Sequence, residues 1–294
     1  MSTSLSPYSC RATPKKDGGA FRSGATSCAG AEPIPYIYTI PHWLPKRTGP
    51  PMGTEQQREE WMEFLHELVG RYGLGGKLDT EDPSFVPIER WQIWNEPNLP
   101  AFWAGAPDPD QYAELLAISE RAIHEVDPTA SLITGGMPAA PRAVPAQQYI
   151  DELYDHFATR GEPVPFDELA LHAYSETVEG SVALVKSFSS AVRSAISPGA
   201  AMPPLLIGEI GWASRGKKHQ PLVGTPESQA KRLNRVYKAL AMLRVPLNIS
   251  AVLWYAWRDA PPGTSCSFCP NIGLFNADGT PKPAWKKFRT MKRY

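Results

Sequence analysis

Net charge is the first thing that this sequence lacks. Its 294 residues hold 30 basic and 30 acidic side chains, and the isoelectric point lies near 7. A domain that binds nucleic acid or an anionic membrane surface normally carries a clear excess of lysine and arginine. The even balance therefore predicts neither nucleic acid nor a membrane as a partner, and it leaves the oligomeric state open.

Long apolar runs are also missing. No stretch of the sequence approaches the roughly 20 residues that a membrane-spanning helix needs. The N-terminus has no apolar core of the kind that signal peptides contain. As written, the chain carries no export signal. Its compartment stays open, and we expect an extracellular location only if further residues precede Met1.

Cysteine is scarce. Cys10, Cys28, Cys266 and Cys269 include a single C-x-x-C pair with no suitably spaced histidines, so they offer no zinc framework. Cys266 and Cys269 lie in a segment rich in proline, glycine and serine. We expect a disulfide between them in an oxidising compartment, with two free thiols as the alternative.

Regular alternation of strand and helix patterns dominates the rest of the chain. Strands are expected at 34–40, 90–95, 132–136, 166–172, 204–212 and 249–255, and helices at 54–72, 109–126, 146–160, 179–195, 226–243 and 283–291. Such alternation, with a spacing of about 40 residues, is typical of a parallel sheet with crossover helices. The prediction is an α/β fold, with residues 1–31 as an irregular or disordered segment and residues 32–294 as one domain.

Two glutamates occupy unusual places in this pattern. Glu96 ends an apolar run and is followed by Pro97, which cannot continue a sheet ladder, so Glu96 is expected at the C-terminal end of a strand. Glu209 is the one acid in the apolar run 204–212. A buried carboxylate is unfavourable unless it is hydrogen-bonded or used. Two strand-end glutamates are what hydrolysis of a glycosidic bond requires.

The segment Trp94-Asn95-Glu96-Pro97-Asn98, followed by Ile207-Gly208-Glu209-Ile210-Gly211-Trp212, resembles the clan of retaining glycoside hydrolases built on (β/α)8 barrels. This clan includes the cellulase and β-xylosidase families. The resemblance covers roughly residues 34 to 290. It implies a glycosidase acting on a carbohydrate substrate, with Glu96 as acid/base and Glu209 as nucleophile.

The same resemblance suggests further contacts to the sugar. Asn95 would bind the 2-hydroxyl, Tyr174 would hydrogen-bond the nucleophile, and Trp254 would form the floor under the sugar. His172 would contact sugar or orient a carboxylate, and His42 and Trp43 would lie at a strand mouth. Three of the candidate residues have a plainer alternative: Glu96 as a structural glutamate paired with an arginine, Asn95 as a turn residue and His172 as a structural histidine. Trp103, Trp212, Trp257 and Asp259 would line outer subsites or pack loops.

Retention and completeness are two further expectations. A retaining enzyme holds its two carboxyl groups about 5 to 5.5 Å apart and needs neither metal nor organic cofactor, because carboxylates handle both steps.

Only one strand is expected before Glu96, where a (β/α)8 barrel of the clan has three. The prediction is thus a TIM-type barrel that is incomplete at its N-terminus, with six clear βα units. The rival function is a truncated, catalytically impaired relative that binds sugar.

Overall fold

Parallel strands surrounded by helices make up the structure, a computed structural model that describes residues 32–38, 49–103, 105–217, 219–261 and 268–291. The elements follow in chain order. They are β1 (Tyr36–Ile37), α2 (Glu55–Tyr72), α3 (Lys77–Glu81), β2 (Arg90–Ile93), η1 (Pro100–Phe102), α4 (Pro109–Val126), β3 (Ser131–Thr134), β4 (Met137–Pro138), α5 (Ala146–Arg160), β5 (Leu169–His172), α6 (Val178–Ala195), β6 (Leu205–Ile210), α7 (Pro226–Leu243), β7 (Ile249–Trp254), η2 (Cys269–Asn271) and α8 (Pro283–Phe288).

The strands pair in the order of the chain, and every pair is parallel. Hydrogen bonds join β1, β2 and β3 in one sheet and β4, β5, β6 and β7 in another. A parallel bridge between Ile133 and Glu168 links β3 to the start of β5, so the two sheets form one curved series. The strand predicted at 132–136 corresponds to β3, which ends before Gly135 and Gly136, and the separate strand β4 follows these two glycines.

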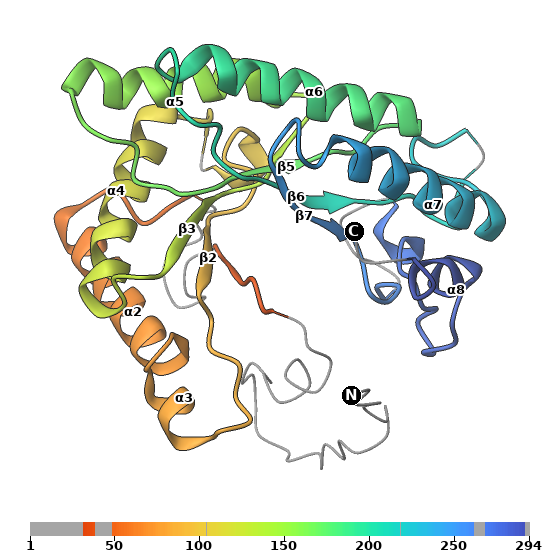
Figure 1. The fold of residues 1–294 in the computed structure, drawn as a ribbon, viewed down its shortest axis with the longest axis horizontal. Coiled ribbons are helices and arrows are strands. Elements are labelled where there is room, and N and C mark those ends of the chain that lie inside the picture. Colours follow the sequence, from red (N-terminus) through yellow and green to blue (C-terminus); the bar gives the residue numbers. More distant parts are fainter. Residues whose placement is uncertain (1–31, 39–48, 104, 218, 262–267, 292–294) are drawn as a thin grey trace.

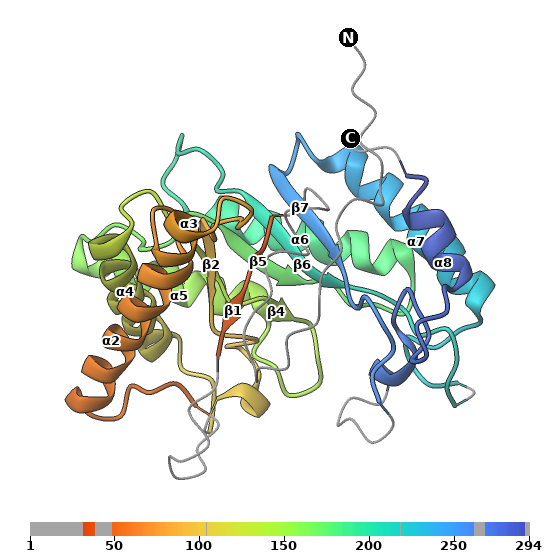
Figure 2. The same cartoon turned by 90° about the horizontal axis from the view of Figure 1, so that it is seen from below.

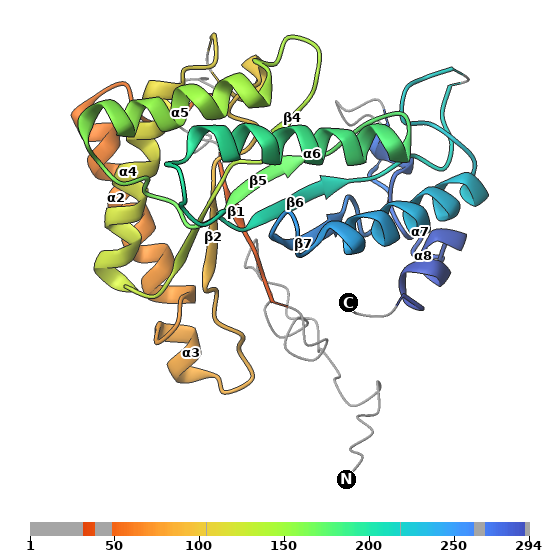
Figure 3. The same cartoon turned by 45° about the horizontal axis from the view of Figure 1, so that its top comes forward.

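Helices cover the outside of this series. α2 packs on α4, α4 on α5, α5 on α6, α6 on α7, and α7 on α8. Figure 1 shows them as an arc around the strands, and Figure 3 shows α5 and α6 in front of β5 and β6. Crossovers of this kind are what the sequence spacing predicts. Among the described residues, no helix combines the length and apolarity that crossing a bilayer requires.

Local signals place several helix ends. The side chains of Thr54, Asp108 and Thr225 each accept a hydrogen bond from a backbone N–H in the first turn of α2, α4 and α7. Thr54 and Gln57, at the spacing of a capping box, do not form the reciprocal pair, because the Gln57 side chain accepts a hydrogen bond from the N–H of Gly53 instead of that of Thr54. Each cap satisfies a backbone donor that the helix itself leaves free.

A small apolar layer fills the inside of the strand series. Ile133, Ala170 and Leu206 are fully buried there, and Ile34 and Ala251 pack against them while partly exposed. Below this layer, Glu168 binds Arg90 and Ser250 across three strands. Inward-facing residues of this type belong to the packed interior of a barrel.

The interior is more open beside the first strand. Tyr36 pairs in register with Gln92, so both side chains point inward, yet Tyr36 is 51% exposed and Gln92 is buried. Within the described part of the chain, β1 and β7 are not hydrogen-bonded to each other. Seen from below, β1 lies in front of the other strands, on the side away from α5 and α6 (Figure 2). The described residues therefore form the α/β architecture predicted, as a series of parallel strands that they do not themselves close.

Candidate active site

Glu96 follows β2 in a turn with an uncommon backbone. Trp94 has φ of 69° and Glu96 has φ of 45°, both in the left-handed region that side-chain-bearing residues rarely adopt. Residues held in this way cluster at functional sites and need surrounding contacts to fix them. The Asn98 amide supplies two such contacts, since it donates to the backbone carbonyls of Pro138 and Val144 at 3.0 and 2.8 Å.

The Tyr112 hydroxyl supports the same turn from α4. It donates to the carbonyl of Ile93 at 2.9 Å and accepts from the N–H of Gly135 at 2.6 Å. A Cβ on Gly135 would lie 2.9 Å from Pro97 and 3.1 Å from the Trp94 carbonyl oxygen. The glycine thus allows the chain after β3 to press against the turn that carries Glu96.

His172 links the two glutamates. It ends β5 and is only 2% exposed. Its Nδ1 lies 2.9 Å from Oε1 of Glu96 and 3.7 Å from Oε2 of Glu209. One carboxylate oxygen from each glutamate lies within 4.8 Å of the other. The two acids predicted from the sequence therefore face each other across a small gap beside this histidine.

Glu209 is held by a second aromatic neighbour. The Tyr174 hydroxyl donates to Oε2 of Glu209 at 2.7 Å. Burial raises the pKa of the Glu209 carboxyl above its ordinary value, His172 and the Tyr174 hydrogen bond act to lower it, and the charge of Glu96 adds to the rise. The pairing of Tyr174 with Glu209 is the contact that the resemblance implies.

Replacing Tyr174 by phenylalanine should move the acidic limb of the pH profile of kcat/KM to higher pH. A hydrogen bond to a charged group is worth about 1.5–3 kcal/mol, and 1.36 kcal/mol corresponds to about one pKa unit. Removing a bond that lowers the pKa of Glu209 raises this pKa further, so the acidic limb should move to higher pH. Tyr237→Phe is the control, because among the described residues the Tyr237 hydroxyl donates to the Val252 carbonyl and to neither glutamate. Equal profiles for both variants would contradict the assignment.

Gly136 makes room for the His172 ring. A Cβ there would lie 2.1 Å from His172 Nε2, whereas a Cβ on Gly208 would lie 3.5 Å from the same ring. Gly136→Ala must therefore displace the ring or the backbone, and overpacking of this kind costs typically about 1–3 kcal/mol. We expect urea unfolding to show that loss for Gly136→Ala and less than about 1 kcal/mol for Gly208→Ala. Equal losses would refute the proposed steric role.

The structure describes some of the other predicted residues and leaves others outside its described ranges. Asn95 is buried between the two strained residues. Trp254 packs near Trp212, and its indole N–H donates to the Ile272 carbonyl at 3.2 Å. His42, Trp43 and Cys266 lie outside the described residues. Cys269 is disulfide-bonded, so the free-thiol alternative is wrong for this residue, while its pairing with Cys266 stays a prediction.

Two tyrosines near the acids were not expected from the sequence. Partial burial of Tyr36, which keeps about half of its surface exposed, raises its pKa to about 12, and the charges of Glu209 and Glu96 contribute after Tyr38. Burial, followed by the same two carboxylates, also raises the pKa of Tyr255, which follows Trp254 at the end of β7. Both phenols thus lie within electrostatic reach of the pair. Their positions depend on the curvature of the strand series, which no local pattern encodes.

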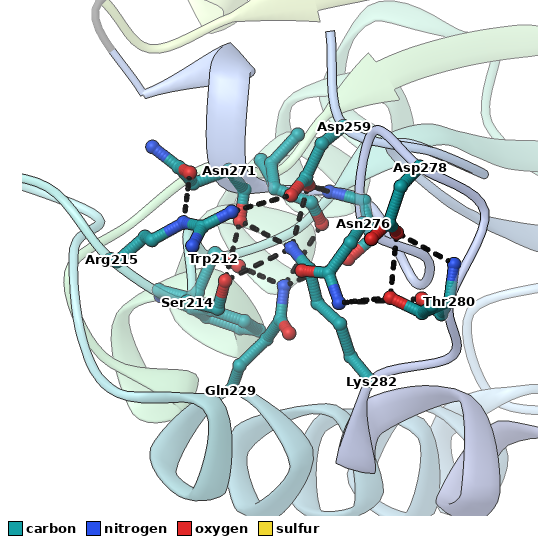
Figure 4. A network of polar contacts seen from close by, with 12 residues as sticks. Trp212, Ser214, Arg215, Gln229, Asp259, Asn271, Asn276, Asp278, Thr280 and Lys282 are labelled. Carbon is teal, nitrogen blue, oxygen red and sulfur yellow. Dashed lines mark hydrogen bonds and ion pairs between the residues drawn. The ribbon is translucent and has the colours of Figure 1, made fainter.

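Four residues were expected either to line outer subsites or to pack loops, and they differ in exposure. Trp103, Trp212 and Asp259 are buried, whereas Trp257 is 62% exposed. Asp259 accepts a hydrogen bond from Lys282 at 2.6 Å, and Lys282 also donates to the Ser214 hydroxyl and the Asn271 carbonyl. Figure 4 shows this network between the loops that follow β6 and β7. Asp259 thus packs loops, as one of the two alternatives states.

Parallel strands, an outer layer of helices and two facing carboxylates at strand ends define the class of (β/α)-barrel glycoside hydrolases. The sequence profile described as glycosyl hydrolases family 39 matches residues 50–293. The chain belongs to this family, and the prediction of a glycosidase-type barrel is confirmed at that level.

Individual relatives agree with the family. A β-xylosidase of Geobacillus stearothermophilus is 29% identical over 139 residues, which are 47% of this chain and 24% of that protein. The structure of a monomeric β-xylosidase from Caulobacter crescentus CB15 matches with a TM-score of 0.61 and 20% identity, over 92% of this chain and 55% of that one. A family 39 glycoside hydrolase from Bacteroides cellulosilyticus WH2 matches with a TM-score of 0.64 and 21% identity, over 90% and 51%.

These similarities cover only part of the relatives. The chain spans about a quarter of the length of the Geobacillus protein and about half of the two solved structures. At identities near 20%, the similarity to the solved structures supports the fold alone.

Proposed function

We propose that this chain hydrolyses β-linked glycosides or glycans with retention of configuration, and that residues 32–294 act as one catalytic unit. The observation that carries the proposal is the approach of Glu96 and Glu209 to within 4.8 Å, oxygen to oxygen. This distance fits the close spacing of retaining enzymes better than the 6.5 Å or more, roughly, of inverting ones. Membership of family 39 and the similarity to β-xylosidases support a carbohydrate substrate.

The proposed reaction has two steps. Glu209 attacks the anomeric carbon and forms a glycosyl ester, while Glu96 gives its proton to the leaving oxygen. Water then attacks the same carbon, Glu96 takes a proton from that water, and the Glu209 carboxylate leaves. His172, at 2.9 Å from Glu96, orients the acid, and Tyr174 holds Glu209 as an anion. Asn95 binds the 2-hydroxyl, and Trp254 or Tyr255 supports the sugar ring.

A panel of aryl β-glycosides tests this function. The wild-type chain should hydrolyse at least one member, and proton NMR should find the β-anomer of the sugar as the first product. If the α-anomer were the first product, the mechanism would be inverting instead of retaining. No turnover of the panel, with sugar binding unaltered in Glu209→Ala, would favour the sugar-binding relative.

Glu96→Gln should separate the acid from the nucleophile. General acid catalysis is worth about 10²- to 10⁴-fold, so hydrolysis of alkyl glycosides should fall by that factor. Aryl glycosides with acidic leaving groups need no proton, and formation of the glycosyl ester from them should be nearly unaffected in a pre-steady-state burst. An equal loss for both kinds of substrate would argue against the acid role of Glu96.

A further inference from the structure

Glu96, His172 and Glu209 together resemble a set of metal ligands. One carboxylate oxygen of each glutamate and one ring nitrogen of His172 lie within 4.8 Å of one another. His172 is fully enclosed, and the side chains of both glutamates are at most 20% exposed. Three donors, from the ends of three strands, thus lie close enough together to share one ion.

We propose that this triad binds a transition-metal ion of the Zn²⁺ type and that the bound ion blocks hydrolysis. The ion is an inhibitor, so this does not alter the expectation that catalysis needs no metal cofactor. The part of the proposal that concerns inhibition rests on the proposed glycosidase function, whereas the binding of the ion does not.

The distances fit such an ion. Zinc bonds of about 2.0–2.2 Å to nitrogen and oxygen, at tetrahedral angles, place neighbouring donors about 3.3–3.6 Å apart. In the structure, His172 Nδ1 lies 2.9 Å from Glu96 Oε1 and 3.7 Å from Glu209 Oε2. The two values lie on either side of the tetrahedral spacing. The two carboxylate oxygens lie within 4.8 Å of each other, so these oxygens must also approach by up to about 1.5 Å before all three donors reach the tetrahedral spacing.

Neighbouring residues position two of the three ligand side chains. Tyr174 donates to the same Glu209 oxygen that faces His172, and an outer contact of this kind orients a ligand. The missing Cβ of Gly136 leaves the place that the His172 ring occupies, since a Cβ there would lie 2.1 Å from Nε2.

The donor set also selects the kind of ion. Imidazole together with carboxylates suits zinc and copper, whereas magnesium and calcium prefer six or more oxygen ligands. A divalent charge would also balance the two carboxylates, which repel each other across the gap. We therefore expect Zn²⁺ to bind and Mg²⁺ not to bind.

Calorimetric titration of the full chain with ZnCl₂, after dialysis against EDTA, tests the site directly. We expect one zinc ion per wild-type chain. Glu209→Gln and His172→Asn should each weaken the affinity more than about 100-fold, and Tyr174→Phe about 10- to 100-fold. His66→Asn is the matched control, because the exposed pair of His66 and Glu125 at 2.8 Å is the kind of surface contact that could attract zinc; it should leave the affinity unaltered.

Three results would overturn the site: no zinc binding by the wild type, undiminished binding by both Glu209→Gln and His172→Asn, or a loss caused by His66→Asn. Circular dichroism of each variant keeps unfolding from being mistaken for loss of a ligand.

Kinetics then separate this inference from the proposed function. With an aryl glycoside, zinc should raise KM without changing kcat, and EDTA should restore activity. Binding with the expected variant pattern but no hydrolysis would support the metal site and refute the glycosidase. Hydrolysis without zinc binding or inhibition would do the opposite.

Discussion

Glu209→Gln is expected to lower kcat by between about 10⁴- and 10⁶-fold while leaving the protein folded. Removing the nucleophile of a covalent mechanism has effects of this size, because no other group can form the intermediate. The amide keeps the shape of the side chain and can still accept the hydrogen bond from Tyr174. Steady-state and single-turnover kinetics with the best aryl glycoside of the panel measure the loss.

The stability of Glu209→Gln provides the control. Burial raises the pKa of Glu209 in the folded chain, so the folded state holds this proton more tightly than the unfolded state. Its contribution to the free energy of unfolding is then favourable below the unfolded pKa and is lost as pH rises through the folded pKa. Glutamine has no such loss. The variant should therefore be more stable than the wild type at pH 7, and this difference should vanish below about pH 4. A less stable variant at pH 7 would point to lost structure instead of lost chemistry.

Lys282→Met is expected to cost about 3–5 kcal/mol in the free energy of unfolding. Lys282 is 3% exposed, and it is the nearer and more buried of the two cations beside the buried carboxylate of Asp259. Breaking a buried pair from one side leaves a charge without its partner, which is the origin of the large cost. The Ser214 hydroxyl and the Asn271 carbonyl lose a donor as well.

Arg215→Met is the matched control for Lys282→Met. The Arg215 guanidinium lies 3.8 Å from the other oxygen of Asp259, but its side chain is 66% exposed. Water compensates for such a contact, so the expected cost is about 0–1 kcal/mol. Urea unfolding of both variants and of Lys282→Met combined with Asp259→Leu measures the difference. Equal costs for the two single variants, or no recovery in the double variant, would refute a buried pair as the cause.

The sequence predicts those parts of the fold that depend on local chemistry. Asp108 before Pro109 and Thr225 before Pro226 mark the starts of α4 and α7 because capping involves only neighbouring residues. The range 146–160 for α5 agrees with the structure for the same kind of reason, since its apolar side chains repeat at helical spacing. The short helix α3 has no buried residue, so its sequence shows no helical repeat of apolar side chains from which it could be predicted.

Features that depend on distant contacts escape the sequence. The break between β3 and β4 lies at Gly135 and Gly136, where the absent Cβ atoms leave space for Pro97 and His172. The strand ends of Glu96 and Glu209 could be predicted because apolar runs and Pro97 mark them. The distance between the two carboxylates, and the position of Tyr36 near them, could not be predicted. Both depend on how strongly the strand series curves.

The central claim is that Glu209 forms a covalent bond to the sugar while Glu96 faces it across the gap. A 2-deoxy-2-fluoro aryl glycoside, matched to the best substrate of the panel, slows the second step and should trap the glycosyl-enzyme. The account predicts a mass increase of one fluoroglycosyl unit, located by peptide mapping on Glu209 and absent in Glu209→Gln. A label on another residue, or none at all while the parent glycoside is turned over, would contradict it.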